Sequence, residues 1–180
     1  MRKLRAAILG SGNIGTDLLI KLTRSANIKC VIMASRNFNS PGMRKASLLN
    51  VKTSDRGIEA LLEEPSTYDI VFDATSAPAH IEHWNSLKKL GKHVIDLTPA
   101  KLGKMCIPPI NAAECMTGGN VNMVTCGGQS AIPIAYALSR VHSDIEYIEI
   151  VSSIASRSAG PATRLNIDEY ISTTEDALKQ

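Results

Sequence analysis

Residues 4–22 read LRAAILGSGNIGTDLLIKL: an apolar run, a glycine-rich turn, and then apolar residues at helical spacing. The pattern G-x-G-x-x-G between a strand and a helix is typical of a turn that binds a dinucleotide. Its first glycine permits the turn, its second lets the backbone approach a pyrophosphate, and its third allows close helix–strand packing. The phosphates are then expected at the helix N-terminus, which favours anions. A glycine-rich turn without a ligand is the alternative.

The rest of the chain continues the alternation of strands and helices that a parallel sheet requires. Strands are predicted at residues 28–34, 68–73, 93–97, 121–124 and 145–154. Helices are predicted at residues 41–50, 57–64, 78–90, 129–141 and 166–177, with Ser54-Asp55 capping the second and Pro133 in the first turn of the fourth. Residues 101–119 show no clear periodicity and are interpreted as a connection.

Two predicted strands end in small, acidic and hydroxyl residues, at 73–76 (DATS) and 96–99 (DLTP). At the carboxyl ends of strands in a Rossmann-type sheet, such residues line the cofactor crevice. Ordinary turn and cap chemistry is the alternative interpretation.

The residue that meets the adenosine ribose is expected about 20 residues beyond the glycines. The sequence there is Ser35-Arg36-Asn37, without an acidic residue to bind the 2′-hydroxyl of NAD. Arg36 could pair with the 2′-phosphate of NADP or stack on the adenine, and a solvated loop arginine explains it equally well. The local chemistry leaves NAD versus NADP open.

A candidate nucleophile lies in residues 120–132, NVNMVTCGGQSAI. The apolar run ends just before Cys126, Gly127-Gly128 is predicted to turn the chain, and a helix follows. Backbone N–H groups and the helix dipole favour a thiolate at such a place. The N–H groups around Gly127 and Gly128 are candidate donors to an oxyanion.

The composition, net charge and apolar runs of the chain argue against several classes of function. The chain has 180 residues, 44% of them hydrophobic and 21% charged, as in a soluble globular protein. A net charge of +3 with scattered Lys and Arg gives no support for nucleic-acid binding. Apolar runs fall short of the roughly 18 residues of a membrane helix. The N-terminal run is broken by the glycine turn, so we expect no signal peptide and a cytoplasmic protein.

The remaining cysteines and histidines form no recognisable metal site. The four cysteines include no C-x-x-C pair, and Cys106 and Cys115 are interpreted as small buried residues rather than as redox partners of Cys126. His80 and His83 have the i, i+3 spacing of a metal pair, but no further ligands converge, so solvated or packing roles are favoured.

Residues 156–164 form a basic, hydroxyl-rich loop that could bind an anion or close over a cofactor, with a plain surface turn as the alternative. With it, five motifs occur in order: GSGNIG, DATSA, DLTPA, NMVTCGGQ and SAGPATRLNIDE. In this order they resemble the acetylating, CoA-acylating acetaldehyde dehydrogenases, which act beside 4-hydroxy-2-oxovalerate aldolase in aromatic meta-cleavage pathways. The resemblance covers nearly the whole chain.

The resemblance implies an α/β protein. An N-terminal, NAD-binding Rossmann-type parallel-sheet domain at residues 1–125 would be followed by the beginning of an α/β catalytic and dimerisation domain at residues 126–180. Because family members run well beyond residue 180, we expect a truncated member or one segment of a split one.

The resemblance also assigns residues. Cys126 matches the acyl-thioester cysteine of the family. The pyrophosphate-binding turn of the family is matched by Ser11, Gly12, Asn13 and Ile14. Its second NAD-binding segment is matched by Arg157, Ser158, Ala159, Gly160, Pro161, Ala162, Thr163, Arg164 and Leu165. Positions near the cofactor and the aldehyde entrance are matched by Asn166 and Ile167. The departures are Arg36, where many members carry Asp, and Ala162, which replaces a usual glycine.

The implied activity is oxidation of acetaldehyde or another short aldehyde to acyl-CoA, with NAD as cofactor and coenzyme A as co-substrate. The Cys126 thiolate would form the thioester that coenzyme A resolves. A homo- or hetero-oligomer is expected, with the aldolase as a candidate partner. The alternatives are a phosphorylating semialdehyde dehydrogenase, a non-catalytic dinucleotide-binding or partner-binding fragment, and a structural Rossmann protein with an inert cysteine.

Overall fold

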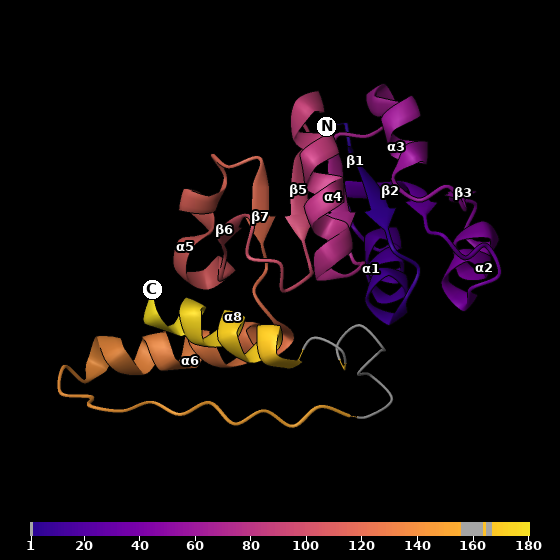
Figure 1. Ribbon diagram of the computed structural model, residues 1–180. Coiled ribbons are helices and arrows are strands. Elements are labelled where there is room, and N and C mark those ends of the chain that lie inside the picture. The colour runs from indigo at the N-terminus through magenta and orange to yellow at the C-terminus, as the bar shows by residue number, and fades with distance from the viewer. Residues whose placement is uncertain (1, 156–163, 165–166) are drawn as a thin grey trace.

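The computed structural model describes residues 2–155, 164 and 167–180. Its strands are β1 Leu4–Leu9, β2 Ile28–Ala34, β3 Lys52–Ser54, β4 Ile70–Asp73, β5 His93–Asp96, β6 Lys104–Met105 and β7 Asn120–Asn122. Within the described residues they form one parallel sheet in the order β3-β2-β1-β4-β5-β7-β6 (Figure 1). The direction of strand addition reverses between β1 and β4, where doubly wound sheets bind ligands. The predicted Rossmann-type α/β fold is confirmed.

Helices connect the strands. They are α1 Asn13–Thr23, α2 Pro41–Leu48, α3 Glu59–Glu63, α4 Ala77–Leu87, α5 Pro108–Cys115, α6 Cys126–Val141 and α8 Ile167–Lys179, with the 3₁₀ turns η1 Pro65–Thr67 and η2 Lys88–Leu90. No helix in the described part of the chain is both long enough and apolar enough to cross a bilayer.

Both faces of the sheet are buried, which explains why its central strands read as continuous apolar runs. On one face Ile8 packs in a cluster with Leu19 of α1 and Met43 of α2. On the other, Leu9 packs in a cluster with Leu61 of α3 and Leu87 of α4. Successive residues of a strand point to opposite faces, so one apolar run supplies both cores.

A third, smaller core lies beyond the carboxyl ends of the strands. Its buried members, from the segments that contain or adjoin α5, α6 and α8, are Ile107, Val124, Ile132 and Ala177. Helices α6 and α8 pack side by side below the sheet (Figure 1). This packing brings the C-terminal segment of the chain to the edge of the sheet that carries the crevice.

Three of the predicted elements are corrected. The strand predicted at residues 145–154 is wrong: these residues belong to no strand in the described part of the chain, and Tyr147 and Val151 are 78% and 83% exposed. An apolar alternation gives a strand only where a neighbour pairs its N–H and C=O groups. The connection at residues 101–119 contains β6 and α5. The cap predicted at Ser54-Asp55 is wrong, because Ile58 precedes α3 and makes no side-chain cap bond.

The helix predicted from residue 129 begins three residues earlier, at Cys126. Pro133 therefore lies in the interior of α6 rather than in its first turn. Proline has no N–H, so the carbonyl of Gln129 loses its usual intrahelical partner there.

Candidate active site

The glycine turn after β1 is built from close backbone approaches. Gly10 has a φ of +99°, and a Cβ on it would lie 2.5 Å from the carbonyl oxygen of Ala74. A Cβ on Gly15 would lie 2.1 Å from the carbonyl oxygen of Gly10. At Gly12, in contrast, no described atom outside the neighbouring residues lies within 4 Å of that position, and α1 has no side-chain cap there. The turn therefore leaves the start of α1 open, as an anion site requires.

Ser11 connects this turn to the loop that follows β2. Its hydroxyl donates to Ser35 Oγ at 2.8 Å and accepts from Ser40 Oγ at 2.7 Å. Ser40 also caps α2 by accepting from the N–H of Met43. The hydroxyl of Ser11 is thus occupied within the chain, while Ile14 is exposed at the start of α1. Arg36 is exposed and follows directly after Ser35.

A buried polar network lies at the carboxyl ends of β4 and β5. Nδ1 of His80 and Nδ1 of His83 lie 2.9 and 2.7 Å from Asp73 Oδ2. Nε2 of His80 lies 3.3 Å from Asp96 Oδ2 and 3.0 Å from Asn120 Nδ2. The sequence interpretation did not anticipate this network. Among the described residues it does not amount to a metal cluster.

The two carboxylates of the network hold the loops that were predicted to line the crevice. Asp73 Oδ1 accepts from the N–H and the hydroxyl of Thr75, and Asp96 Oδ1 accepts from the N–H of Thr98. Burial alone would raise the pKa of Asp73, but hydrogen bonds from the two histidines outweigh it and lower this pKa. At Asp96 burial prevails and the pKa is raised. Asp73 is therefore the carboxylate whose charge the histidines stabilise.

Cys126 is exposed and is the first residue of α6. Thr125 caps this helix, its Oγ1 accepting from the N–H of Gly128 at 2.9 Å. The turn predicted at Gly127-Gly128 is wrong, because both glycines lie in the first turn of α6. The chain turns instead at Val124, whose φ is +59°. The sequence gives no sign of this turn, since a β-branched residue rarely takes a positive φ.

Tyr170 of α8 is a site residue that the sequence analysis missed. Its Oη lies 3.4 Å from Cys126 Sγ and accepts from the N–H of Gly127 at 2.7 Å. Both candidate oxyanion donors are therefore engaged within the chain, Gly127 by Tyr170 and Gly128 by Thr125. Burial and the neighbouring thiol raise the pKa of Tyr170, so its hydroxyl keeps the proton that it can donate to sulfur.

The other cysteines are free but shielded. Burial raises the pKa of Cys30 to about 12 and, with the neighbouring Cys115, that of Cys106 to about 11. Cys106 and Cys115 are buried, as predicted, whereas Cys126 is exposed. Because the thiolate is the nucleophile, Cys126 is the candidate for chemistry.

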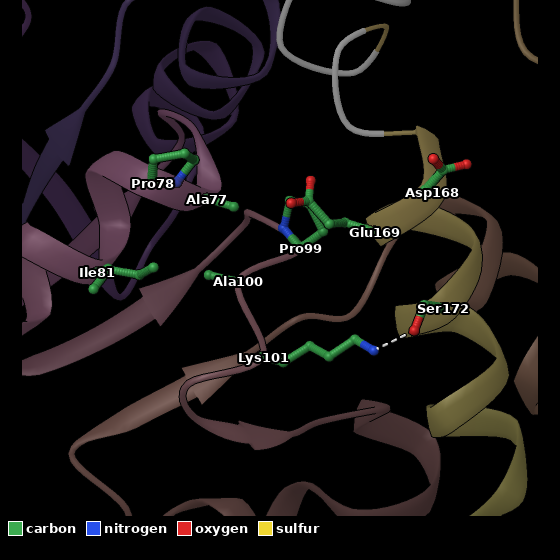
Figure 2. Close-up of a pocket in the computed structure, with 9 residues that line it drawn as sticks. All are labelled: Ala77, Pro78, Ile81, Pro99, Ala100, Lys101, Asp168, Glu169 and Ser172. Atoms are coloured by element: carbon green, nitrogen blue, oxygen red, sulfur yellow. Dashed lines mark hydrogen bonds between the residues drawn. The ribbon is translucent and has the colours of Figure 1, made fainter.

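A cavity of about 520 Å³ opens at the same edge of the sheet, between the start of α4, the loop after β5, and α8 (Figure 2). It is lined by Ala77, Pro78, Ile81, Pro99, Ala100, Lys101, Asp168, Glu169 and Ser172. Lys101 closes one side through a 2.6 Å hydrogen bond to Ser172 Oγ. The wall on the sheet side is apolar and the wall on α8 is acidic, so the cavity suits a small, partly apolar group.

Most of the second predicted NAD-binding segment lies outside the residues that the structure describes. Arg157, Ser158, Ala159, Gly160, Pro161, Ala162, Thr163 and Leu165 lie outside the described residues, as does Asn166. Arg164 is exposed, and Ile167 begins α8. Contact of Ser11, Gly12, Asn13 and Ile14 with a cofactor stays a prediction.

Two family models cover most of the chain. Residues 5–116 match the NAD-binding domain of semialdehyde dehydrogenases, and residues 126–180 match the dimerisation region of prokaryotic acetaldehyde dehydrogenase.

Curated relatives extend these matches. The chain is 66% identical to an acetaldehyde dehydrogenase of Pectobacterium atrosepticum, over 99% of this chain and 61% of that protein. It is 55% identical to an acetaldehyde dehydrogenase of Spirochaeta aurantia, over 99% of this chain and 60% of that protein. The chain thus spans about 60% of the length of these relatives.

Solved structures share the fold. GenD2 from gentamicin A biosynthesis, in complex with NAD, has a TM-score of 0.54 at 18% identity, over 75% of this chain and 39% of its own. An NAD-binding protein from Listeria innocua has a TM-score of 0.53 at 17% identity, over 78% of this chain and 41% of its own. Fold, motifs and family matches agree: this chain belongs to the family that carries the NAD-binding domain of semialdehyde dehydrogenases, and it is similar to acetaldehyde dehydrogenases over 99% of its length.

Proposed function

We propose that this chain contributes the nucleophile and the NAD site to CoA-acylating oxidation of acetaldehyde or another short aldehyde. The observation that carries the proposal is the exposed thiol of Cys126 at the start of α6. It follows a strand of the same parallel sheet whose glycine turn leaves the start of α1 open. The names of the curated relatives support an aldehyde dehydrogenase, and the motif resemblance supports coenzyme A as the acceptor.

The residues present fit a dinucleotide. A Cβ on Gly12 would meet no described atom within 4 Å outside the neighbouring residues, and the N-cap of α1 makes no side-chain hydrogen bond, which supports a pyrophosphate site at this helix N-terminus. Ser11, Asn13 and Ile14 complete this turn in the proposal. Arg36 leaves NADP as a second ligand to be measured beside NAD.

In the proposed reaction the sulfur of Cys126 first acts as the nucleophile and later as the leaving group. The Cys126 thiolate attacks the aldehyde carbon, a C–S bond forms, and the carbonyl π pair moves onto oxygen. NAD, when bound, supplies the acceptor for the hydride that leaves this carbon, so that a thioester remains on Cys126. The thiolate of coenzyme A then attacks the thioester carbon, acyl-CoA leaves, and the Cys126 thiolate is restored.

Tyr170 is proposed to assist the sulfur. Its oxygen accepts from Gly127 N–H, so its proton is directed to another acceptor, and Cys126 Sγ is 3.4 Å away. A thiolate can only accept, which makes the phenol the donor of this pair. The same hydroxyl can donate to an oxyanion that forms one bond away from the sulfur.

The decisive experiment measures acyl transfer. The chain is incubated with acetyl-CoA, and acetylation is located by intact-mass and peptide mass spectrometry. We expect a single acetyl group on Cys126, released by coenzyme A, and none on Cys126→Ala, which should keep its affinity for NAD by calorimetry. Acetylation that persists in Cys126→Ala would contradict the proposal. In a second reaction, the acyl-enzyme is formed from acetaldehyde and NAD, and release by phosphate but not by coenzyme A would identify a phosphorylating enzyme.

The matched dimerisation region supports a further part of the proposal. We place the domain boundary before Cys126, with the NAD-binding domain at residues 1–125 and the start of the catalytic and dimerisation domain at residues 126–180. Ile134 and Val141 of α6 are 63% and 77% exposed, as expected for a face that a second subunit covers. A cytoplasmic location and an aldolase partner belong to the same proposal. Light scattering and co-purification with the aldolase test the assembly.

A further inference from the structure

We propose that Asn122 is a positioning residue that aims Cys126 at the crevice by holding the turn at Val124. The inference rests on the proposed role of Cys126 as the nucleophile. Asn122 is buried and Val124 has a positive φ, and both lie shortly before the reactive cysteine in the chain.

Asn122 is completely buried, and its side-chain amide is fully bonded. Nδ2 donates to Asp96 Oδ2 at 2.8 Å and to the carbonyl oxygen of Thr98 at 3.0 Å, while Oδ1 accepts from the N–H of Val124 at 2.8 Å. Exchanging the amide oxygen and nitrogen would put two donors together at Val124 and two acceptors together at Asp96. The partners therefore allow one orientation of the amide.

Val124 takes a positive φ, which is unfavourable for a β-branched residue. Two contacts hold it there. Its side chain is buried in the third core with Ile107 and Ile132, and its N–H is bonded to Asn122. Without the hydrogen bond from the N–H of Val124 to Asn122 Oδ1, we expect the backbone of Val124 to return to an extended conformation. Thr125, which caps α6, and Cys126 follow directly, so relaxation at Val124 changes the direction in which the sulfur points.

Asn122 also connects the loop after β5 to the turn that precedes Cys126. Through Asp96 and the carbonyl of Thr98 it holds the loop after β5, which supplies Pro99 and Ala100 to the cavity. Through Val124 it holds the cysteine turn. A single side chain thus sets the position of the sulfur relative to the crevice, and an error of about 1 Å in such a distance can cost about a hundredfold in rate.

The test is a set of variants with Asn120→Ala as the matched control. Asn120 lies in the same strand and is also buried, but its Nδ2 is bonded to His80 and not to the cysteine turn. We expect Asn122→Ala to slow acetyl transfer from acetyl-CoA to Cys126 about tenfold or more. It should also slow alkylation of Cys126 by iodoacetamide about threefold, because the sulfur leaves the helix N-terminus. Asn120→Ala should lose stability without either effect.

Adding Val124→Gly to Asn122→Ala separates positioning from plain structural support. Glycine takes a positive φ without strain, so the double variant should recover both rates while its thermal stability falls further, since a core side chain is lost. A double variant no faster than Asn122→Ala, or an Asn122→Ala variant with wild-type rates, overturns the inference. If the wild-type chain is alkylated but never acetylated, the proposed function fails, and the alkylation rates still decide the role of Asn122.

Discussion

Among the strand-to-helix turns at the carboxyl edge of the sheet, the turn after β1 and the turn after β7 are built in opposite ways. The turn after β1 gets its shape from Gly10 and Gly15 and leaves the start of α1 without a side-chain cap. The turn after β7 bends at a valine, and the first N–H groups of α6 are bonded to Thr125 and Tyr170.

The difference follows from what each turn must present. A turn that binds a phosphate needs a helix N-terminus that the ligand can reach and no side chain in front of it, and glycine meets the second need. A turn that presents a sulfur needs a fixed side-chain direction, which hydrogen bonds and core packing around it provide. The first turn is therefore sensitive to added atoms, and the second to lost hydrogen bonds.

The largest expected loss of stability comes from a substitution in the turn after β1. In Gly15→Ala the new Cβ would meet the carbonyl oxygen of Gly10 at 2.1 Å, backbone against backbone, so α1 must move away from β1. We expect the free energy of unfolding to fall by about 3 kcal/mol, as in other overpacked cores. Urea denaturation followed by circular dichroism measures it.

Gly12→Ala is the matched control for this change. With open space at Gly12, we expect the free energy of unfolding to change by less than about 1 kcal/mol, while the affinity for NAD falls about tenfold or more. Equal stability losses at both glycines would mean that the turn is not held by the contact between Gly15 and Gly10.

The second prediction uses the histidine network, which Asp96 and Asn122 join to the cysteine turn. The folded-state pKa of Asp73 lies below its unfolded value, so its contribution to stability is present above about pH 4 and is lost as the pH falls below it. Asp96 has the opposite sign, because its raised pKa favours the protonated folded form in acid. We expect net acid destabilisation, measured by urea titration at several pH values. In Asp73→Asn, a stability that still falls as steeply in acid would contradict this assignment.

Removing the cap of the second turn should have a smaller effect. Thr125→Val keeps the shape of the side chain but loses the hydroxyl bonded to Gly128 N–H and Thr174 Oγ1. We expect the free energy of unfolding to fall by about 1 kcal/mol. Thr125→Ser keeps the hydroxyl and serves as the control in thermal denaturation. A Thr125→Val variant as stable as the wild type would show that the cap does not hold this turn.

The smallest expected loss of stability comes from a change at Tyr170, which tests directly how the turn after β7 holds the sulfur. Tyr170→Phe removes one oxygen, and we expect a stability loss of only about 0.5 kcal/mol. Alkylation of Cys126 should slow about threefold, because the donor to the sulfur is lost, and the N–H of Gly127 becomes free. Faster alkylation would mean that Tyr170 shields the sulfur rather than assisting it.

Much of the fold is readable from the sequence because it depends on local patterns. Strands β1, β2, β4 and β5 contain buried apolar runs, and the G-x-G-x-x-G turn lies between a strand and a helix, where this motif is informative. The edge strands β3 and β6 have three and two residues, too few to show a period.

The site is less readable, because its contacts are distant in the chain or run against propensity. The sequence predicts Cys126 as a nucleophile on a turn between a strand and a helix, but it does not predict Tyr170, which reaches the cysteine from 44 residues away. The turn at Val124 has no sequence signature, since glycine is the residue expected at a positive φ. The helical spacing of His80 from Ala77 and Leu87 does place it on the buried face of α4. Its partners could not be predicted in this way, because Asp73, Asp96 and Asn120 come from three different strands.

The short strands at both rims of the sheet have a consequence for the behaviour of the protein at high concentration. A sheet edge can recruit strands from other molecules when it presents a long row of unpaired N–H and C=O groups. Here the rims offer three residues at β3 and two at β6, too few to template growth of an amyloid-like stack. We therefore expect that the folded protein does not extend its sheet by pairing with the edge strands of other molecules.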